Sequence, residues 1–117
     1  MTSITYFTKV QNTVEKWIGD LGFKVRSEID IEQYRADLVI SELGMVVEID
    51  GPSHRKLKKE GNLITKESIH KVSKRDIVLL EHFPKGIWHV PVDIDEEVFK
   101  EEFKKIIGVL ADEKRIE

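Results

Sequence analysis

The stretch MVVEIDGPSH, residues 45–54, carries the pattern that decides the fold. It opens with an apolar run of the kind found in a buried strand, and two carboxylates, Glu48 and Asp50, end that run. A glycine and a proline then break the strand, and His54 follows. Because side chains alternate along a strand, Glu48 and Asp50 are predicted to share one face of a sheet.

Apolar spacing along the rest of the chain predicts the order helix, three strands, helix, strand, helix. The connector 41–44 includes a glycine, so the second and third strands are predicted to form an antiparallel hairpin. A helix between the third and fourth strands predicts a right-handed crossover. The fold class is therefore α/β, a mixed four-stranded sheet flanked by helices. The predicted elements are a helix over 7–21, an extended segment over 23–28, strands over 34–40, 45–50 and 87–92, an irregular segment over 55–62, a helix from Thr65 to about Phe83, and a helix over 98–110.

Length and composition limit the classes of protein that this chain can be. Its 117 residues suit a single domain over 1–117, and a hydrophobic content of 40% allows one core. The chain has no cysteine and no pattern of a signal peptide or membrane span, so we predict a soluble, intracellular, cytoplasmic protein without a membrane partner. The net charge of -3 means that nucleic acid would have to be bound through a local basic patch or through metal ions.

A third carboxylate, Asp37, is predicted to join the acidic pair. Arg35, Asp37 and Val39 share one face of the second strand, so the hairpin can place Asp37 beside Glu48. Clustered carboxylates repel one another unless a cation lies between them, and hard divalent ions such as Mg²⁺ or Mn²⁺ suit their oxygens. Such ions commonly act on phosphate esters. The alternative is a strand with a solvated face, which the apolar run before Glu48 argues against.

Glu15 is a further candidate metal ligand. It flanks the apolar stripe of the first helix, from where its carboxylate could lean over the sheet. The alternative is an ordinary exposed helix glutamate, which the helix pattern alone favours.

His54 is the histidine that the sequence singles out. The turn before it is predicted to hold the imidazole next to the carboxylates, where its chemistry suits proton transfer. The alternative is a loop histidine with a backbone hydrogen bond. His70, His82 and His89 have no comparable neighbours and are predicted to be surface or strand residues.

A dense set of basic residues follows the proposed site. They are predicted to contact phosphates of nucleic acid, although a solvated loop and helix face is the commoner fate of such residues. The residues are Arg55, Lys56, Lys58, Lys59, Lys66, Lys71, Lys74 and Arg75.

Together these features resemble the PD-(D/E)XK nuclease superfamily, and most closely its very-short-patch-repair-like branch, which includes small endonuclease-like domains and the RNA-associated RAP domain. The resemblance rests on Glu15, on RADLVI with Asp37 and on VVEIDGPSH, with a weaker likeness in TKESIHKVSKRDIVLL and IWHVP. It covers roughly residues 10–95, and EIDGPSH is its specific part. The resemblance implies a restriction-endonuclease-like fold and a metal-dependent endonuclease.

The resemblance also implies a role for each matching residue. Asp37 and Glu48 would hold the metal ion, and Glu15 would contact the metal or its water. Asp50 stands where the superfamily usually has a lysine that positions the attacking water. In the branch that this chain resembles, a histidine and an aspartate replace that lysine, and His54 matches the histidine.

Three functions follow from these patterns. The first is a divalent-metal-dependent nuclease that hydrolyses DNA phosphodiester bonds, with DNA favoured over RNA. The second is a catalytically inactive, RAP-like nucleic-acid-binding module on the same fold, which the absent motif lysine favours. The third is a small interaction protein whose acids form only a solvated edge. The general base stays open between His54 and Lys66, a lysine supplied from the second helix. A homodimer, a structured DNA target or a partner protein are the alternatives for specificity.

Overall fold

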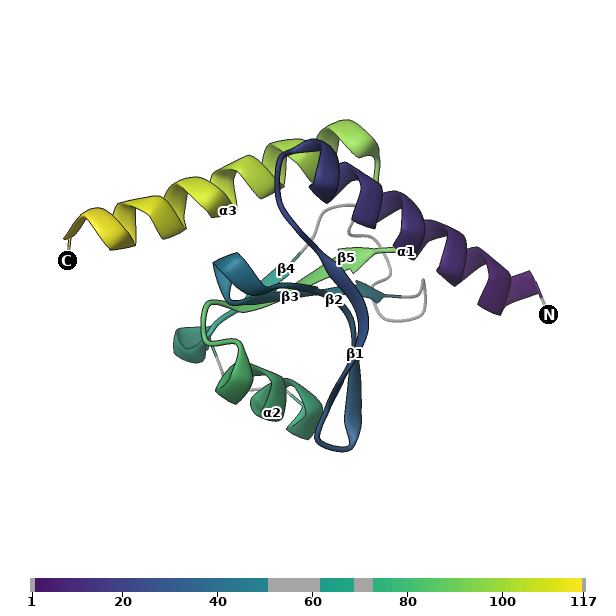
Figure 1. Ribbon diagram of the computed structural model, residues 1–117, viewed down its shortest axis with the longest axis horizontal. Coiled ribbons are helices and arrows are strands. Elements are labelled where there is room, and N and C mark those ends of the chain that lie inside the picture. Colours follow the sequence, from purple (N-terminus) through teal and green to yellow (C-terminus); the bar gives the residue numbers. More distant parts are fainter. Residues whose placement is uncertain (1, 51–61, 69–72, 117) are drawn as a thin grey trace.

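The structure, a computed structural model, describes residues 2–50, 62–68 and 73–116 and has helices on both faces of a mixed sheet (Figure 1). No helix in this part of the chain is both long enough and apolar enough to span a membrane. The predicted order of helix, three strands, helix, strand and helix is present, with one further strand. The elements are α1 (Thr2–Asp20), β1 (Arg26–Ile31), β2 (Tyr34–Ile40), η1 (Ser41–Leu43), β3 (Met45–Asp50), β4 (Asn62–Ile64), η3 (Lys66–Ser68), α2 (Lys74–His82), β5 (Gly86–Pro91) and α3 (Glu96–Ile116).

The five strands lie in the order β1-β2-β3-β5-β4. β1, β2 and β3 form an antiparallel meander, β5 lies parallel to β3, and β4 lies antiparallel to β5. The predicted hairpin is confirmed, since Leu38 pairs with Val47 and Gly44 adopts the left-handed conformation, at φ 62°, after η1. The prediction of four strands was wrong, because β4 has three residues, too few to show an alternating pattern.

Two predicted boundaries were also wrong. α2 begins at Lys74 and not at Thr65, because Ser73 has an extended backbone and its Oγ accepts a hydrogen bond from Asp76 N at 3.1 Å. Thr65 instead precedes the short η3. β1 occupies 26–31 where 23–28 was predicted, because most side chains of this edge strand are exposed and its apolar pattern is weak.

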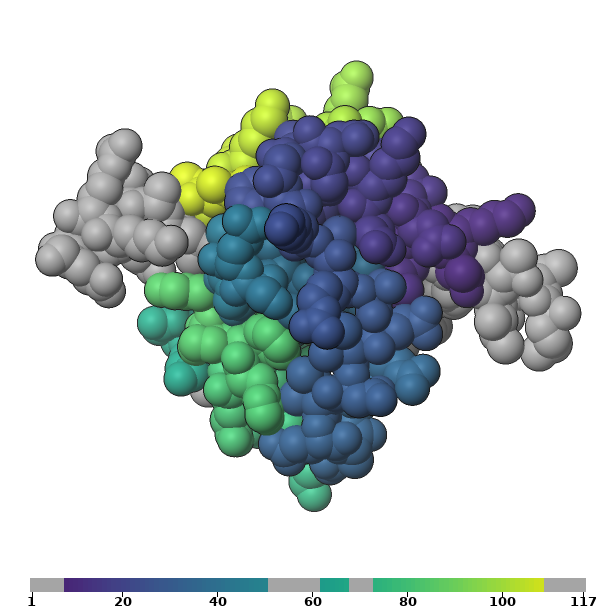
Figure 2. Space-filling model, in the orientation of Figure 1, coloured from purple at the N-terminus to yellow at the C-terminus, as the bar shows by residue number. Residues whose placement is uncertain are grey.

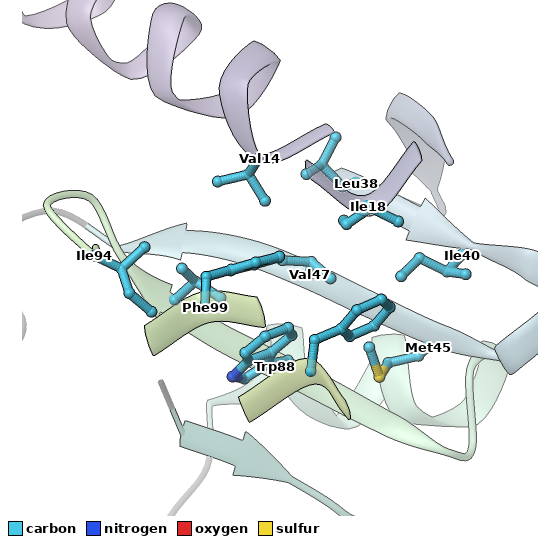
Figure 3. Close-up of a cluster of buried hydrophobic side chains, with 11 residues drawn as sticks. Val14, Ile18, Leu38, Ile40, Met45, Val47, Trp88, Ile94 and Phe99 are labelled. Carbon is cyan, nitrogen blue, oxygen red and sulfur yellow. The ribbon is translucent and has the colours of Figure 1, made fainter. Parts of the chain in front are cut away.

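The main hydrophobic core lies between the sheet and the two long helices, α1 and α3 (Figures 1 and 3). Trp88 of β5 stacks on two rings of α3, with its ring centroid 4.7 Å from that of Phe99 and 5.7 Å from that of Phe103. Rings of this size supply much of the apolar area that a small core can bury. The buried members are Val14, Ile18, Leu38, Ile40, Met45, Val47, Trp88, Val90, Ile94, Phe99 and Phe103.

The opposite face of the sheet carries α2 and the tip of the β1–β2 hairpin. Figure 2 shows the hairpin in blue beside α2 in green. At the tip, Glu32 Oε2 lies 3.0 Å from His82 Nε2 at the end of α2. The hairpin therefore bends towards α2. The buried members of this second cluster are Ile31, Ala36, Val39, Val46, Leu79, Leu80 and Ile87.

Candidate active site

Asp37 of β2 and Glu48 of β3 lie where the β1–β2 hairpin separates from β3. The ladder between β2 and β3 reaches Leu38 and Val47, and Asp37 and Glu48 are the next residues on the two strands. There Glu48 Oε2 accepts a hydrogen bond from Asp37 N at 2.7 Å, and Asp37 Oδ2 accepts one from Ile49 N at 2.8 Å. The two carboxylates thus bond backbone N–H groups at the point where strand pairing stops. We call this point, defined by Asp37 and Glu48, the strand fork.

Among the described residues, the cation at the strand fork is the guanidinium of Arg75, in the first turn of α2. Its Nη1 pairs with Glu48 Oε1, and its Nη2 donates to the carbonyl oxygen of Arg35 at 2.6 Å. The side chain of Glu48 is 5% exposed and that of Arg75 is 31% exposed, so the arginine of this ion pair is the partner that borders solvent. The sequence assigned Arg75 to phosphate contacts, whereas here it pairs with a buried acid of the site itself.

The pKa values of both acids at the strand fork are raised. Burial is the largest cause for Asp37, and the hydrogen bond from Ile49 N and the charge of Arg75 oppose it. Burial also raises the pKa of Glu48, as does the neighbouring charge of Asp37, against the hydrogen bond from Arg75. At both acids the effect of burial therefore outweighs the hydrogen bonds and the charge of Arg75.

A second charged cluster, made of Asp50, His89 and Asp76, lies beside the strand fork. His89 of β5 is the register partner of Glu48 on the parallel strand β3. Its Nδ1 lies 3.0 Å from Asp50 Oδ1, and its Nε2 lies 3.2 Å from Asp76 Oδ2. Because an ionised carboxylate only accepts hydrogen bonds, both ring nitrogens donate and the ring is an imidazolium. Burial lowers the pKa of His89, but the hydrogen bonds and charges of the two aspartates outweigh it and raise that pKa to about 10.

This second cluster joins the ends of β3, β5 and α2. Asp76 follows Arg75 directly and lies in the helical turn that Ser73 caps. The contact between His89 and Asp76 therefore fixes the first turn of α2 against the sheet, and with it the place from which Arg75 reaches Glu48.

The structure brings together Asp37 and Glu48, as predicted, on adjacent antiparallel strands. Asp50 bonds to His89 and, although its charge acts on Asp37, it does not join the pair in a three-residue group that could hold a metal ion within the described residues. Nor does the structure bring Glu15 to the strand fork. α1 packs on the face of the sheet that carries Leu38 and Val47, whereas alternation along β3 places Glu48 on the face that α2 covers.

Lys66 lies on η3, away from the acids. β4 runs antiparallel to β5, with Asn62 paired to His89 and Ile64 paired to Ile87, so the chain moves away from the position of His89 before it reaches Lys66. Lys74 is exposed at the start of α2. The other residues that the sequence proposed lie outside the described residues, namely His54, Arg55, Lys56, Lys58, Lys59 and Lys71.

Sequence reasoning missed the roles of His89 and Asp76. A usable signal was present for His89, which stands between Trp88 and Val90 in an apolar strand, where a polar side chain on a covered face needs a partner. The spacing from Ser73 to Asp76 is that of a capping residue and the third residue of a helix. What the sequence did not contain was the register that places Asp50 and Asp76 on either side of the ring.

The donor set at the strand fork fits a hard divalent cation. Mg²⁺ is commonly held by one or two carboxylates, with water and phosphate oxygens completing its coordination. Within 2–50, 62–68 and 73–116, no three or more histidine, cysteine, aspartate or glutamate side chains gather as a metal-holding group. At the fork itself, both oxygens of Glu48 and Oδ2 of Asp37 already have partners, so an ion that binds Glu48 directly has to replace one of them.

Comparison of the chain with protein-family models, with curated proteins and with solved structures finds no match. The function must therefore be argued from the geometry of the site.

Proposed function

We propose that this protein is a divalent-metal-dependent nuclease that hydrolyses DNA phosphodiester bonds. The observation that carries the proposal is the strand fork, where half-buried Asp37 and buried Glu48 converge from adjacent strands, with the Arg75 guanidinium as their counterion among the described residues. A site with that excess of negative charge has an affinity for a divalent cation, and a cation held by two carboxylates is suited to phosphate-ester chemistry.

The arrangement of the strands supports the same proposal. The chain runs from α1 through the antiparallel meander β1–β3 to α2 and then to β5, which is parallel to β3. Apart from the short β4 before α2, this is the order expected for a restriction-endonuclease-like fold. In this arrangement β2 and β3 are neighbours, so the two acids that the resemblance assigns to the metal meet at one place.

Each residue then has a role that its contacts allow. Asp37 and Glu48 would supply oxygens to Mg²⁺ or Mn²⁺, and such an ion would supply Lewis-acid chemistry at a phosphate. His89 keeps Asp50 and the start of α2 in place. His54 remains the proposed proton acceptor, with Lys66 as its rival, and the basic residues of 55–59 with Lys74 are the proposed contacts to the DNA backbone.

A catalytically inactive nucleic-acid-binding module is the second candidate. It is favoured by one observation, that both oxygens of Glu48 are already engaged, one by Asp37 N and the other by Arg75. On this alternative the acids serve the fold, and the basic residues alone define the function.

The two candidates are separated by a nicking assay on supercoiled plasmid DNA, with single-stranded RNA in parallel, in Mg²⁺, Mn²⁺ or EDTA. The nuclease proposal requires cleavage that EDTA stops and that Asp37→Asn and Glu48→Gln abolish. Glu101→Gln is the matched control. Glu101 is exposed on α3, which covers the other face of the sheet, and its substitution removes the same charge. Salt-dependent binding by the wild type without cleavage in any metal would establish the second candidate instead.

The same assay tests the general base. If His54 accepts the proton, His54→Ala lowers the cleavage rate by about 10²-fold or more and leaves affinity for DNA nearly unchanged. Loss of cleavage in Lys66→Ala with an unaffected His54→Ala would assign the role to Lys66.

A further inference from the structure

Arg75 is the cationic side chain at the strand fork that combines a buried acidic partner with a side open to solvent. Its Nη1 contacts Glu48 Oε1, its Nη2 donates to Arg35 O at 2.6 Å, and its side chain is 31% exposed. The charges of Asp37 and Asp76 also act on it. The guanidinium is therefore held by one acid of the proposed metal site, Glu48, and by a backbone carbonyl, while part of the side chain stays exposed.

We propose that Arg75 is an exchangeable counterion, which neutralises Glu48 until a divalent cation replaces it and then binds a phosphate of the nucleic acid. This inference rests on the proposed function and assigns to that site a coupling between its metal and its substrate.

The first argument concerns the two oxygens of Glu48. Oε2 accepts the hydrogen bond from Asp37 N at 2.7 Å, and Oε1 contacts Arg75. A cation that binds Glu48 directly has to displace one of these partners. Displacement of Asp37 N would leave a backbone N–H without an acceptor at the strand fork, which is costly in a buried place. Displacement of Arg75 moves a flexible side chain that already borders solvent. The cation therefore takes the place of Arg75.

The second argument concerns where the guanidinium goes. Asp76 is engaged by His89, and Asp37 is engaged by Ile49 N, so the neighbouring acids already have donors. An arginine stays charged and needs an anion, and a phosphate accepts its paired N–H groups in the same planar geometry as a carboxylate. A phosphodiester bound at the metal lies within the same site. The displaced guanidinium thus gains a partner only when nucleic acid is present.

A coupling follows from this exchange. Without a metal, Arg75 competes for Glu48 and contributes nothing to binding of nucleic acid. With a metal, the guanidinium is released to the phosphate, so metal and nucleic acid each raise the affinity for the other by the same factor.

The first measurement is a calorimetric titration of Mn²⁺ alone into the wild type, Arg75→Gln and Lys74→Gln. Removal of the competing guanidinium should tighten Mn²⁺ binding by about tenfold, the range of a charged hydrogen bond. Lys74 is the matched control, because it is the exposed neighbour of Arg75 with the same charge, and Lys74→Gln should leave the Mn²⁺ affinity nearly unchanged. Arg75→Lys keeps the charge without the planar fork and should lie between the wild type and Arg75→Gln.

The second measurement is the affinity for a short DNA duplex over a series of salt concentrations, in EDTA and in Ca²⁺, another ion with a preference for carboxylate oxygens. In EDTA, Arg75→Gln should bind like the wild type. In Ca²⁺ it should bind more weakly, with a dependence of log K on log salt that is shallower by about 0.9, the value for one phosphate contact. Lys74→Gln should weaken binding by the same factor in both conditions.

The outcomes distinguish this inference from the proposed function. Equal Mn²⁺ affinity in the wild type and Arg75→Gln would overturn the exchange and leave the metal site standing. Equal weakening of duplex binding in EDTA and in Ca²⁺ would also overturn it, because Arg75 would then be a fixed phosphate contact. Absence of Mn²⁺ binding to the wild type and to both Arg75 variants would overturn the metal-dependent nuclease together with the exchange. If Arg75→Gln does not fold, Arg75→Lys decides the same question, and a Mn²⁺ affinity equal to that of the wild type refutes the exchange.

Discussion

The protein should lose stability as the pH rises from neutral to alkaline, because His89 gives up a proton that the folded state holds. Burial lowers the pKa of His89, but the hydrogen bonds from its ring to Asp50 and Asp76 raise it from an ordinary 6.5 to about 10. A basic group whose pKa is raised on folding stabilises fully below its unfolded pKa, and that stabilisation is lost as the pH passes its folded pKa. The loss therefore falls between 6.5 and about 10.

The size of the effect follows from the same two values. At about 1.4 kcal/mol for each pKa unit, the rise from 6.5 to about 10 corresponds to a loss on the order of 5 kcal/mol in the free energy of unfolding. That is a large part of the roughly 5–15 kcal/mol by which domains are usually stable. Above the transition, the neutral ring of His89 can donate a hydrogen bond to only one of its two partners, the half-buried Asp50 and the buried Asp76.

The assay is urea unfolding followed by circular dichroism at a series of pH values from about 6 to about 10.5, a range chosen to bracket both pKa values. His89→Gln should be less stable at neutral pH and should show little of the alkaline loss. His82→Gln is the control, because His82 forms an exposed pair with Glu32 and should follow the wild type. A wild-type free energy of unfolding that stays constant from about pH 7 to about pH 10, or a loss that persists in His89→Gln, would refute the reasoning.

Substitutions at four further positions test the structure. Glu48→Ala should lower the free energy of unfolding in urea by about 1–3 kcal/mol, since Asp37 N and the Arg75 guanidinium lose their acceptor; a variant as stable as the wild type would show that the strand fork needs no acid. Gly86→Ala should destabilise by about 1–3 kcal/mol in thermal unfolding, because Gly86 has φ 134° and an added Cβ would lie 2.9 Å from Ile64 O. Gly19→Ala, where no atom lies within 4 Å of the added Cβ, should instead stabilise α1 by about 0.5–1 kcal/mol, and shifts of the same sign in the two glycine variants would contradict this. Ser73→Ala should cost about 1 kcal/mol through loss of the cap of α2, and recovery of that loss in Ser73→Asp would identify the cap as its cause.

The meander of the fold could be predicted because its information is local. The runs Tyr34–Ile40 and Met45–Asp50 are rich in apolar residues and flank a four-residue connector, and the structure has strands with those same bounds. The pairing of Asp37 with Glu48 followed from the same alternation. β4 could not be predicted, because three residues beside a polar segment carry no period.

The partners of the acids could not be predicted, because they depend on contacts between distant segments. Arg75 reaches Glu48 only because the crossover lays the start of α2 beside the strand fork. Asp50 meets His89 only through the register of the parallel strands β3 and β5. From the sequence alone, removal of one carboxylate would be expected to relieve repulsion, whereas the hydrogen bonds made by Glu48 predict a loss of stability.

The hydrogen bonds at the strand fork also bear on how such a protein evolves. Asp37 and Glu48 each satisfy a backbone N–H of the opposing strand, so selection for correct folding is enough to retain them. A descendant that no longer performed any reaction would keep both acids for as long as it kept its sheet. Arg75 also serves the fold, because it pairs with buried Glu48 and donates to the carbonyl oxygen of Arg35. Across a lineage, an unchanged acidic pair would therefore be no sign that activity had been retained.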